Sequence, residues 1–226
     1  MDGLVEFVAS RLDNTILRFD VEKAALLKFF EDSVSYGIRG VVVHPSMLEV
    51  LGHLPREGTK LVSVVAFPFG YTGLDVKLKE IDYCIEAGAD ELDVVLNIFY
   101  IKEGELDKFR DEARAVVTRV REWGEDIVLK TIVEVTLLDR EGLDAAIGVV
   151  NEVRPDFFKT STGYGPRGTD ADDVRYVKSR LDPDIGIKAA GSVSSLDKFM
   201  ELVEAGADVI GASRGFDILR EAEARE

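Results

Sequence analysis

Several residue types are scarce in this sequence, and each shortage excludes a class of protein. The chain has one cysteine, Cys84, among its 226 residues, so it has no internal disulfide and we expect a reducing compartment. Its two histidines, His44 and His53, cannot form a three-histidine zinc site; a carboxylate-rich metal site stays open, although no clear motif indicates one. Lysine and arginine (28) are outnumbered by aspartate and glutamate (43), which gives a net charge of -15. Phosphate backbones require a basic face, so a nucleic-acid partner is not expected.

Long apolar runs are also missing. None is long enough to span a bilayer, and no N-terminal stretch resembles a signal peptide. We therefore expect a soluble, cytoplasmic protein with no membrane partner. The hydrophobic residues, 46% of the chain, are sufficient for a large core within one domain.

Short apolar segments that suit strands alternate with segments of helical spacing along the whole chain. The predicted strands are 11–17, 40–44, 61–67, 91–96, 127–133, 156–160, 185–189 and 208–212. The predicted helices are 2–10, 21–36, 74–87, 105–123, 140–152, 170–181, 194–205 and 215–223. Eight strands that alternate with helices predict an α/β fold, a (β/α)8 TIM barrel with a short N-terminal helix, in which residues 1–226 form a single domain. An open, doubly wound sheet is the alternative.

Polar residues lie on or just after several predicted strands, where a barrel places its functional groups. They are Asp13, Asn14, Thr15, Asp93, Asn97, Lys130, Glu134, Lys159 and Lys188. The period of two groups Asp93 with Asn97, and Lys130 with Glu134, on common faces. If those faces point inward, three lysines and two or three carboxylates share the barrel interior. Burying ions rarely increases stability, so such an interior favours a functional role over a space-filling one.

Lys159 and Lys188 are the most informative pair. A lysine at a strand end can simply reach to water, but a buried, unprotonated amine can attack a carbonyl. Two ammonium groups about 5 Å apart at an effective dielectric near 20 repel by roughly 3 kcal/mol, or about two pKa units. This repulsion would favour a neutral amine on one of them. Asp93 would then transfer protons, and Lys130 would hold Asp93 ionised.

Three loops after the predicted strands six to eight, 160–163, 191–195 and 211–215, are rich in glycine and hydroxyl side chains. Backbone N–H groups at helix starts bind anions, and barrels often bind phosphate here; ordinary turns and helix caps are the alternative. Residues 163–168 also match the dinucleotide-binding pattern GxGxxG. Because Pro166 and Arg167 lie within that turn and the expected helix cap, Thr169 or Asp170, follows it, we do not favour a dinucleotide site.

Motifs along nearly the whole chain resemble the deoxyribose-phosphate aldolase family, which uses a lysine Schiff base. They follow in the family's order: Leu12–Leu17, Phe67–Gly70, Gly88–Val95, Leu129–Glu134, Phe158–Gly163, Lys188–Gly191 and Gly211–Ser213. The Lys-Thr-Ser-Thr-Gly run with Lys-Ala-Ala-Gly downstream is the most specific part. The resemblance implies reversible cleavage of 2-deoxy-D-ribose 5-phosphate to acetaldehyde and D-glyceraldehyde 3-phosphate, without a metal or an organic cofactor.

The resemblance also implies individual roles. Lys159 would form the Schiff base, Lys188 would lower its pKa, and Asp93 would transfer protons with help from Lys130. Asp13 and Thr15 would contact substrate hydroxyls. The implied phosphate-binding residues are Gly163, Gly191, Ser192, Ser213 and Arg214.

The sequence departs from the family pattern mainly at the phosphate end. Asn14 stands where histidine is frequent, Ser192 where the family has a second glycine, and Arg214 where serine is common. An arginine often found shortly after the paired glycines is missing, and Arg167 or Arg214 could restore its charge. The competing hypotheses are a Schiff-base aldolase for another phosphorylated sugar or aldehyde, and an inactive barrel that only binds ligands. Self-association with further copies of the chain remains open.

Overall fold

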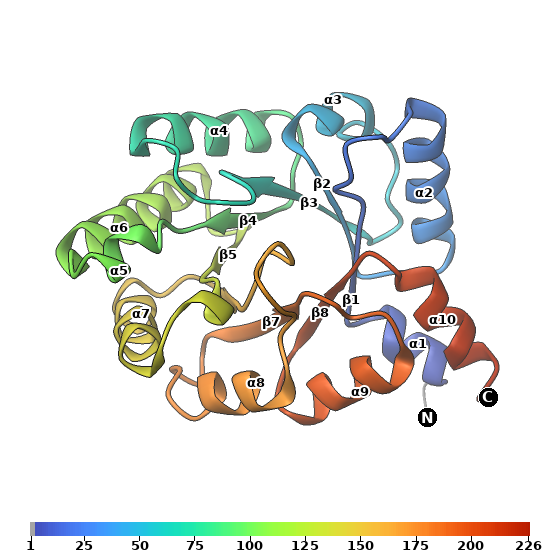
Figure 1. The fold of residues 1–226 in the computed structure, drawn as a ribbon. Helices are drawn as coiled ribbons and strands as arrows, with labels where there is room; N and C mark the ends of the chain where they lie inside the picture. The colour runs from blue at the N-terminus through green and yellow to red at the C-terminus, as the bar shows by residue number, and fades with distance from the viewer. Residues whose placement is uncertain (1–2) are drawn as a thin grey trace.

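The computed structural model describes residues 3–226, and its centre is a closed barrel of eight parallel strands in the order β1 to β8 (Figure 1). The strands are β1 Leu12–Thr15, β2 Gly40–Val43, β3 Lys60–Val65, β4 Glu91–Val95, β5 Val128–Ile132, β6 Phe157–Lys159, β7 Gly186–Ala190 and β8 Val209–Ala212. The predicted (β/α)8 barrel is therefore confirmed, and the doubly wound alternative is wrong, because β1 pairs with β8 and closes the sheet.

Helices surround the barrel and connect successive strands (Figure 1). They are α1 Leu4–Ala9, α2 Lys23–Ser35, α3 Leu48–Leu51, α4 Leu74–Glu86, α5 Phe99–Lys102, α6 Leu106–Trp123, α7 Arg140–Val153, α8 Ala171–Lys178, α9 Leu196–Glu204 and α10 Gly215–Glu223, with 3-10 turns η1 Pro45–Met47 and η2 Val135–Leu137. The sequence predicted eight of these helices and missed the short segments α3, α5, η1 and η2. Position 2, at which the first predicted helix starts, lies outside the described residues.

The chain ends of the described part lie close together, since α1 and α10 are side by side (Figure 1). The backbone N–H of Val5 donates to Glu226 Oε1 at 3.0 Å. No helix among residues 3–226 is both long and apolar enough to cross a membrane.

Two apolar clusters form the core. The larger one lies between the barrel and its helices and contains the outward-facing residues of the strands, such as Leu12, Phe158 and Ile187. The smaller one contains only Val42, Val62 and Val64, on β2 and β3. Barrel interiors are normally filled by layers of branched apolar side chains. Here such side chains fill only the part of the interior next to β2 and β3.

The pairing register determines which side chains meet inside the barrel. Asp93 on β4 is paired with Lys130 on β5, and Lys159 on β6 with Lys188 on β7. Asp13 on β1 is paired with Gly211 on β8. Since side chains alternate between the two faces of a strand, these charged residues project to the same interior side.

Candidate active site

A network of seven charged side chains occupies the rest of the barrel interior. Its carboxylates are Asp13, Glu91 and Asp93, and its cations are Arg39, Lys130, Lys159 and Lys188. All are buried except Arg39, whose side chain is 19% exposed. The sequence prediction that three lysines share the interior with two or three carboxylates is confirmed.

Asp93 is the centre of this network. Its Oδ2 accepts hydrogen bonds from Lys159 Nζ at 2.7 Å and from Lys188 Nζ at 2.6 Å. Its Oδ1 lies 3.2 Å from Lys130 Nζ. Burial alone would raise the pKa of Asp93, but the three lysines hold it well below its usual value. Asp93 is therefore an ionised acceptor shared by two amines, which is a geometry that permits proton transfer.

The lysines differ in the number of carboxylates that they contact. Lys130 Nζ lies 2.5 Å from Glu91 Oε2, besides Asp93, and 3.9 Å from Asp13 Oδ2. Lys188 Nζ contacts both Asp13 and Asp93 at 2.6 Å. Among the carboxylates of residues 3–226, Lys159 Nζ contacts Asp93 alone. The ammonium form is least stabilised at Lys159, so this lysine is the first expected to lose its proton.

The pKa values of Lys159 and Lys130 agree with the difference in their carboxylate contacts. Burial, opposed by Asp93 and assisted by the neighbouring Lys188 and Lys130, lowers the pKa of Lys159 to about 8. Burial also disfavours the charged form of Lys130, but its carboxylate partners raise its pKa above the ordinary value. At neutral pH about a tenth of Lys159 is thus a neutral amine, whereas Lys130 stays an ammonium.

Glu134, just beyond the end of β5, holds the loop that follows Lys159. Its Oε1 accepts from Ser161 Oγ at 2.8 Å, and its Oε2 accepts from the backbone N–H and the hydroxyl of Thr162 at 2.9 and 2.7 Å. Thr136 Oγ1 donates to it as well. Glu134 therefore belongs to the rim of the barrel and not to the interior network, although the strand alternation grouped it with Lys130.

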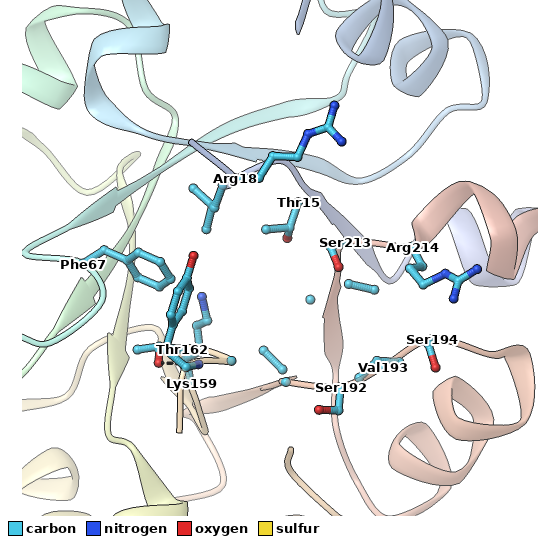
Figure 2. A pocket seen from close by; sticks show the side chains of 17 residues that line it. Thr15, Arg18, Phe67, Lys159, Thr162, Ser192, Val193, Ser194, Ser213 and Arg214 are labelled. Atoms are coloured by element: carbon cyan, nitrogen blue, oxygen red, sulfur yellow. Dashed lines mark hydrogen bonds between the residues drawn. The ribbon is translucent and has the colours of Figure 1, made fainter. Parts of the chain in front are cut away.

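A cavity of about 500 Å³ opens above the network at the C-terminal ends of the strands. Lys159 is the one member of the network that lines it. Figure 2 shows Phe67, Lys159 and Thr162 on one side, and Ser192, Ser194, Ser213 and Arg214 on the other. Of the two residues expected to contact substrate hydroxyls, Thr15 lines the cavity, whereas Asp13 is fully buried below it.

The residues proposed for phosphate binding all line this cavity: Gly163, Gly191, Ser192, Ser213 and Arg214. Gly163 and Gly191 have φ of +88° and +98°, and a Cβ on Gly191 would lie 3.6 Å from the Cα of Gly163. The two loops thus approach backbone to backbone. Helix α10 starts directly after Arg214, and a helix start leaves N–H groups free to bind an anion.

The arginines at this end are already paired. Arg214 Nε donates to Asp217 Oδ2 at 2.7 Å, and its side chain points away from the cavity in Figure 2. Arg167 contacts Asp170 and Asp173 and does not line the cavity. Arg18, which no sequence motif singled out, lines the rim and pairs with Asp20 at 3.3 Å.

Asn97 and the GxGxxG run have other roles than the alternation and the motif suggested. Asn97 Oδ1 accepts from the N–H of Phe99 at the start of α5, so it does not extend the interior face beyond Asp93. The 163–168 run is a loop, and the helix after it, α8, has Asp170 as its N-cap, which forms a capping box with Asp173. The predicted cap is therefore confirmed.

Two members of the network, Arg39 and Glu91, were missed from the sequence. Glu91 could have been found, because it lies two residues before Asp93 on the same strand and so on the same face. Arg39 precedes β2 and is not part of any periodic pattern.

Comparison with known proteins identifies the relatives of this chain. It is 34% identical over 215 residues to the deoxyribose-phosphate aldolase of Caldanaerobacter subterraneus subsp. tengcongensis, covering 95% of this chain and 93% of that one. It is also 34% identical to the enzyme of that name from Thermococcus kodakarensis, with 94% and 95% covered. No protein-family model matches the chain.

A solved structure gives the same result at the level of the fold. The deoxyribose phosphate aldolase from Aeropyrum pernix, described as having a unique tetrameric structure, superposes with a TM-score of 0.89 at 30% identity, covering all of this chain and 94% of that one. A similarity of this length extends over every strand that contributes to the ionic network. On these similarities, the chain belongs to the deoxyribose-phosphate aldolase family.

Proposed function

We propose that this protein is a class I aldolase that reversibly cleaves 2-deoxy-D-ribose 5-phosphate to acetaldehyde and D-glyceraldehyde 3-phosphate. The observation that carries the proposal is the amine of Lys159. It lies at the floor of the cavity, has a single carboxylate partner, and has a pKa lowered to about 8 by burial and by its cationic neighbours. An amine of this kind is a competent nucleophile toward an aldehyde.

The reaction would proceed as follows. Neutral Lys159 adds to the C1 aldehyde of the open-chain sugar to give a carbinolamine, which takes up one proton and loses water to give an iminium. A base removes the proton of the C3 hydroxyl, the C2–C3 bond breaks, and its electron pair neutralises the iminium as an enamine while D-glyceraldehyde 3-phosphate leaves. Protonation of the enamine at C2 and hydrolysis release acetaldehyde and restore the amine.

Asp93 and Lys188 serve the proton transfers in this proposal. Asp93 accepts from both amines through one oxygen atom, so a proton can pass between Lys159 and Lys188 without rearrangement of the side chains. Lys130 keeps Asp93 ionised. Thr15 contacts a substrate hydroxyl from the cavity wall, and Asp13, which has no exposed surface, acts through Lys188.

The phosphate group would bind between the loops after β6, β7 and β8. Gly163 and Gly191 provide close backbone approach, Ser192 and Ser213 provide hydroxyls, and Arg214 provides charge once it exchanges Asp217 for the substrate. Arg–phosphate contacts are often bidentate, so this exchange replaces a mostly exposed ion pair by a stronger one.

Borohydride trapping tests the proposal directly. The protein is incubated with 2-deoxyribose 5-phosphate, reduced, digested and analysed by mass spectrometry, with Lys159→Met as the matched control. We expect a reduced adduct on Lys159 in the unmodified protein and none in the variant. An adduct on Lys188 or Lys130 would reverse the assigned roles, and no adduct with either the sugar or acetaldehyde would contradict the aldolase mechanism.

One observation favours a second candidate, a Schiff-base aldolase for a different phosphorylated sugar or aldehyde. The phosphate end combines Ser192 at a left-handed φ of +57° with two rim arginines, Arg18 and Arg214. Side chains other than glycine adopt this φ rarely, and such strain is often found at ligand sites. Turnover measured on a small panel of sugar phosphates and aldehydes distinguishes the two candidates.

The proposal treats residues 1–226 as one catalytic domain in the cytoplasm, acting on small molecules. Because the Aeropyrum pernix relative is described as tetrameric, we further propose that this chain forms homo-oligomers. Sedimentation equilibrium of the purified protein gives the molar mass that decides it.

A further inference from the structure

The charged side chains below Lys159 form a closed ring. Asp93 contacts Lys188, Lys188 contacts Asp13, and Asp13 Oδ1 lies 2.6 Å from Arg39 Nη1. On the other side Arg39 donates to both oxygens of Glu91 at 2.8 and 3.1 Å, Glu91 contacts Lys130, and Lys130 returns to Asp93. Three carboxylates and three cations alternate around this ring, and Lys159 is attached to it only through Asp93.

The charges of the ring cancel. Asp13, Glu91 and Asp93 balance Arg39, Lys130 and Lys188, so Lys159 in its ammonium form is a seventh, uncompensated ion. An arginine stays charged at any accessible pH, which makes Arg39 a fixed member of this balance. Arg39 touches no residue of the cavity lining in these contacts, and the proposed reaction assigns no role to it or to Glu91.

The backbone next to Arg39 is adapted to this arrangement. A Cβ on Gly40 would lie 2.5 Å from Asp13 Oδ1, the atom that Arg39 contacts. Any larger residue at that position would displace the Asp13 carboxylate from Arg39. Glycine after Arg39 therefore allows the ring to close on the β1–β2 side.

We propose that Arg39 and Glu91 are positioning residues that close this ring and thereby set the charge balance around the Lys159 amine. The inference rests on the proposed function, since that function is what requires a neutral Lys159. Neither residue touches substrate; both act through Asp13, Lys130 and Asp93.

The proposal predicts opposite effects for two isosteric changes. Arg39→Gln removes one positive charge and Glu91→Gln removes one negative charge. The charged groups that face Lys159 itself are Asp93 from β4, Lys130 from β5 and Lys188 from β7, and all three remain in both variants. A unit charge roughly 10 Å away at an effective dielectric near 20 moves a pKa by about one unit. Arg39→Gln should therefore raise the pKa of Lys159 by about one unit, and Glu91→Gln should lower it by a similar amount.

Trace labelling measures this without depending on turnover. Substoichiometric acetic anhydride is applied over a range of pH, and the acetylated fraction of the Lys159 peptide is read by mass spectrometry. Arg39→Lys should restore the behaviour of the unmodified protein, and the double variant Arg39→Gln/Glu91→Gln should return the titration close to its original midpoint. Because the double variant keeps the charge balanced, it tests the proposal even if a single variant fails to fold.

Arg56→Gln is the matched control. Arg56 is an arginine of similar exposure, 20%, in an ion pair with Asp90 outside the ring. The Arg56→Gln variant should leave the Lys159 titration unchanged. Shifts of equal sign in the two ring variants, or a double variant that does not return, would overturn the proposal.

Cleavage of 2-deoxyribose 5-phosphate is measured on the same samples and separates the two claims. If the pKa of Lys159 shifts in opposite directions in the two variants but no sample, including the unmodified protein, cleaves the sugar, the ring is supported and the proposed function is rejected. Normal turnover with an unmoved Lys159 titration would reject the ring and leave the function standing.

Discussion

Replacing Lys188 by methionine tests how much of the Lys159 reactivity comes from a neighbouring charge. Both amines donate to the same oxygen of Asp93, at 2.7 and 2.6 Å, so their nitrogens are about 5 Å apart at most. Methionine has a similar length and no charge, and it packs well in irregular spaces. The change therefore removes the repulsion with little change of volume.

The magnitude follows from this separation. At about 5 Å and an effective dielectric near 20, two unit charges repel by roughly 3 kcal/mol, or about two pKa units. Burial remains, so the pKa of Lys159 should rise from about 8 toward its ordinary value and not beyond it by much. At neutral pH the neutral fraction, and with it kcat/KM, should fall by about 100-fold through protonation alone.

The assay is the initial rate of 2-deoxyribose 5-phosphate cleavage between about pH 6 and pH 10. The rate is monitored through reduction of the aldehyde product. The acid limb of kcat/KM should lie near pH 8 in the unmodified protein and about two units higher in Lys188→Met. Lys188→Arg, which keeps the charge, should lower the plateau without moving the limb. A limb that stays near pH 8 in a folded Lys188→Met protein would refute the reasoning and assign the lowered pKa to burial alone.

Three further predictions concern residues with different roles. Lys159→Met should abolish turnover yet raise the melting temperature at neutral pH, because it removes the one cation without its own carboxylate from a buried site, a gain of about 1–3 kcal/mol. Glu134→Ala should lower stability by roughly 2–4 kcal/mol and reduce kcat, since it leaves Ser161 and Thr162 without their acceptor. Glu134→Gln should recover part of the stability and part of kcat. Thermal melts and steady-state rates measure the two effects. Arg214→Ala should raise KM for 2-deoxyribose 5-phosphate much more than for 2-deoxyribose, and equal changes for both sugars would exclude a phosphate contact.

Much of the fold follows from local patterns in the sequence. Glycines such as Gly88 and Gly206 end helices at positive φ, and apolar runs between them suit buried parallel strands. The short segments α3 and α5 were missed because four residues make only about one helical turn, in which the period cannot repeat. Their positions are decided by packing against neighbouring elements, which periodicity does not contain.

The candidate site was predictable where it lies on strands. Asp93, Lys130, Lys159 and Lys188 are polar residues in otherwise apolar runs, and alternation places them on the inner face. Arg39 was not predictable in this way. It precedes its strand, and its contacts with Asp13 and Glu91 span 26 and 52 residues of sequence.

The same distinction applies to the ends of strands. Asn97 and Glu134 continue the alternation of β4 and β5 in the sequence, but both lie beyond the last paired residue. Once the ladder ends, the backbone turns, and the side chains bond to loops instead of entering the interior. For β4 and β5, alternation therefore predicted the inward face correctly only within the strand residues themselves, Glu91–Val95 and Val128–Ile132.

The unbalanced charge of the network is consistent with covalent chemistry on Lys159. With a neutral amine, the other six ions cancel; when the amine becomes an iminium, with uptake of one proton and loss of water, a positive charge returns next to Asp93. A second carboxylate on Lys159 would stabilise the ammonium and reduce the supply of nucleophile, as the raised pKa of Lys130 illustrates. With no carboxylate, the iminium would be buried without a counter-ion, which is strongly unfavourable. A single contact to a carboxylate shared with Lys188 avoids both outcomes, so the number of carboxylates around each lysine, more than burial itself, distinguishes the nucleophile from its neighbours.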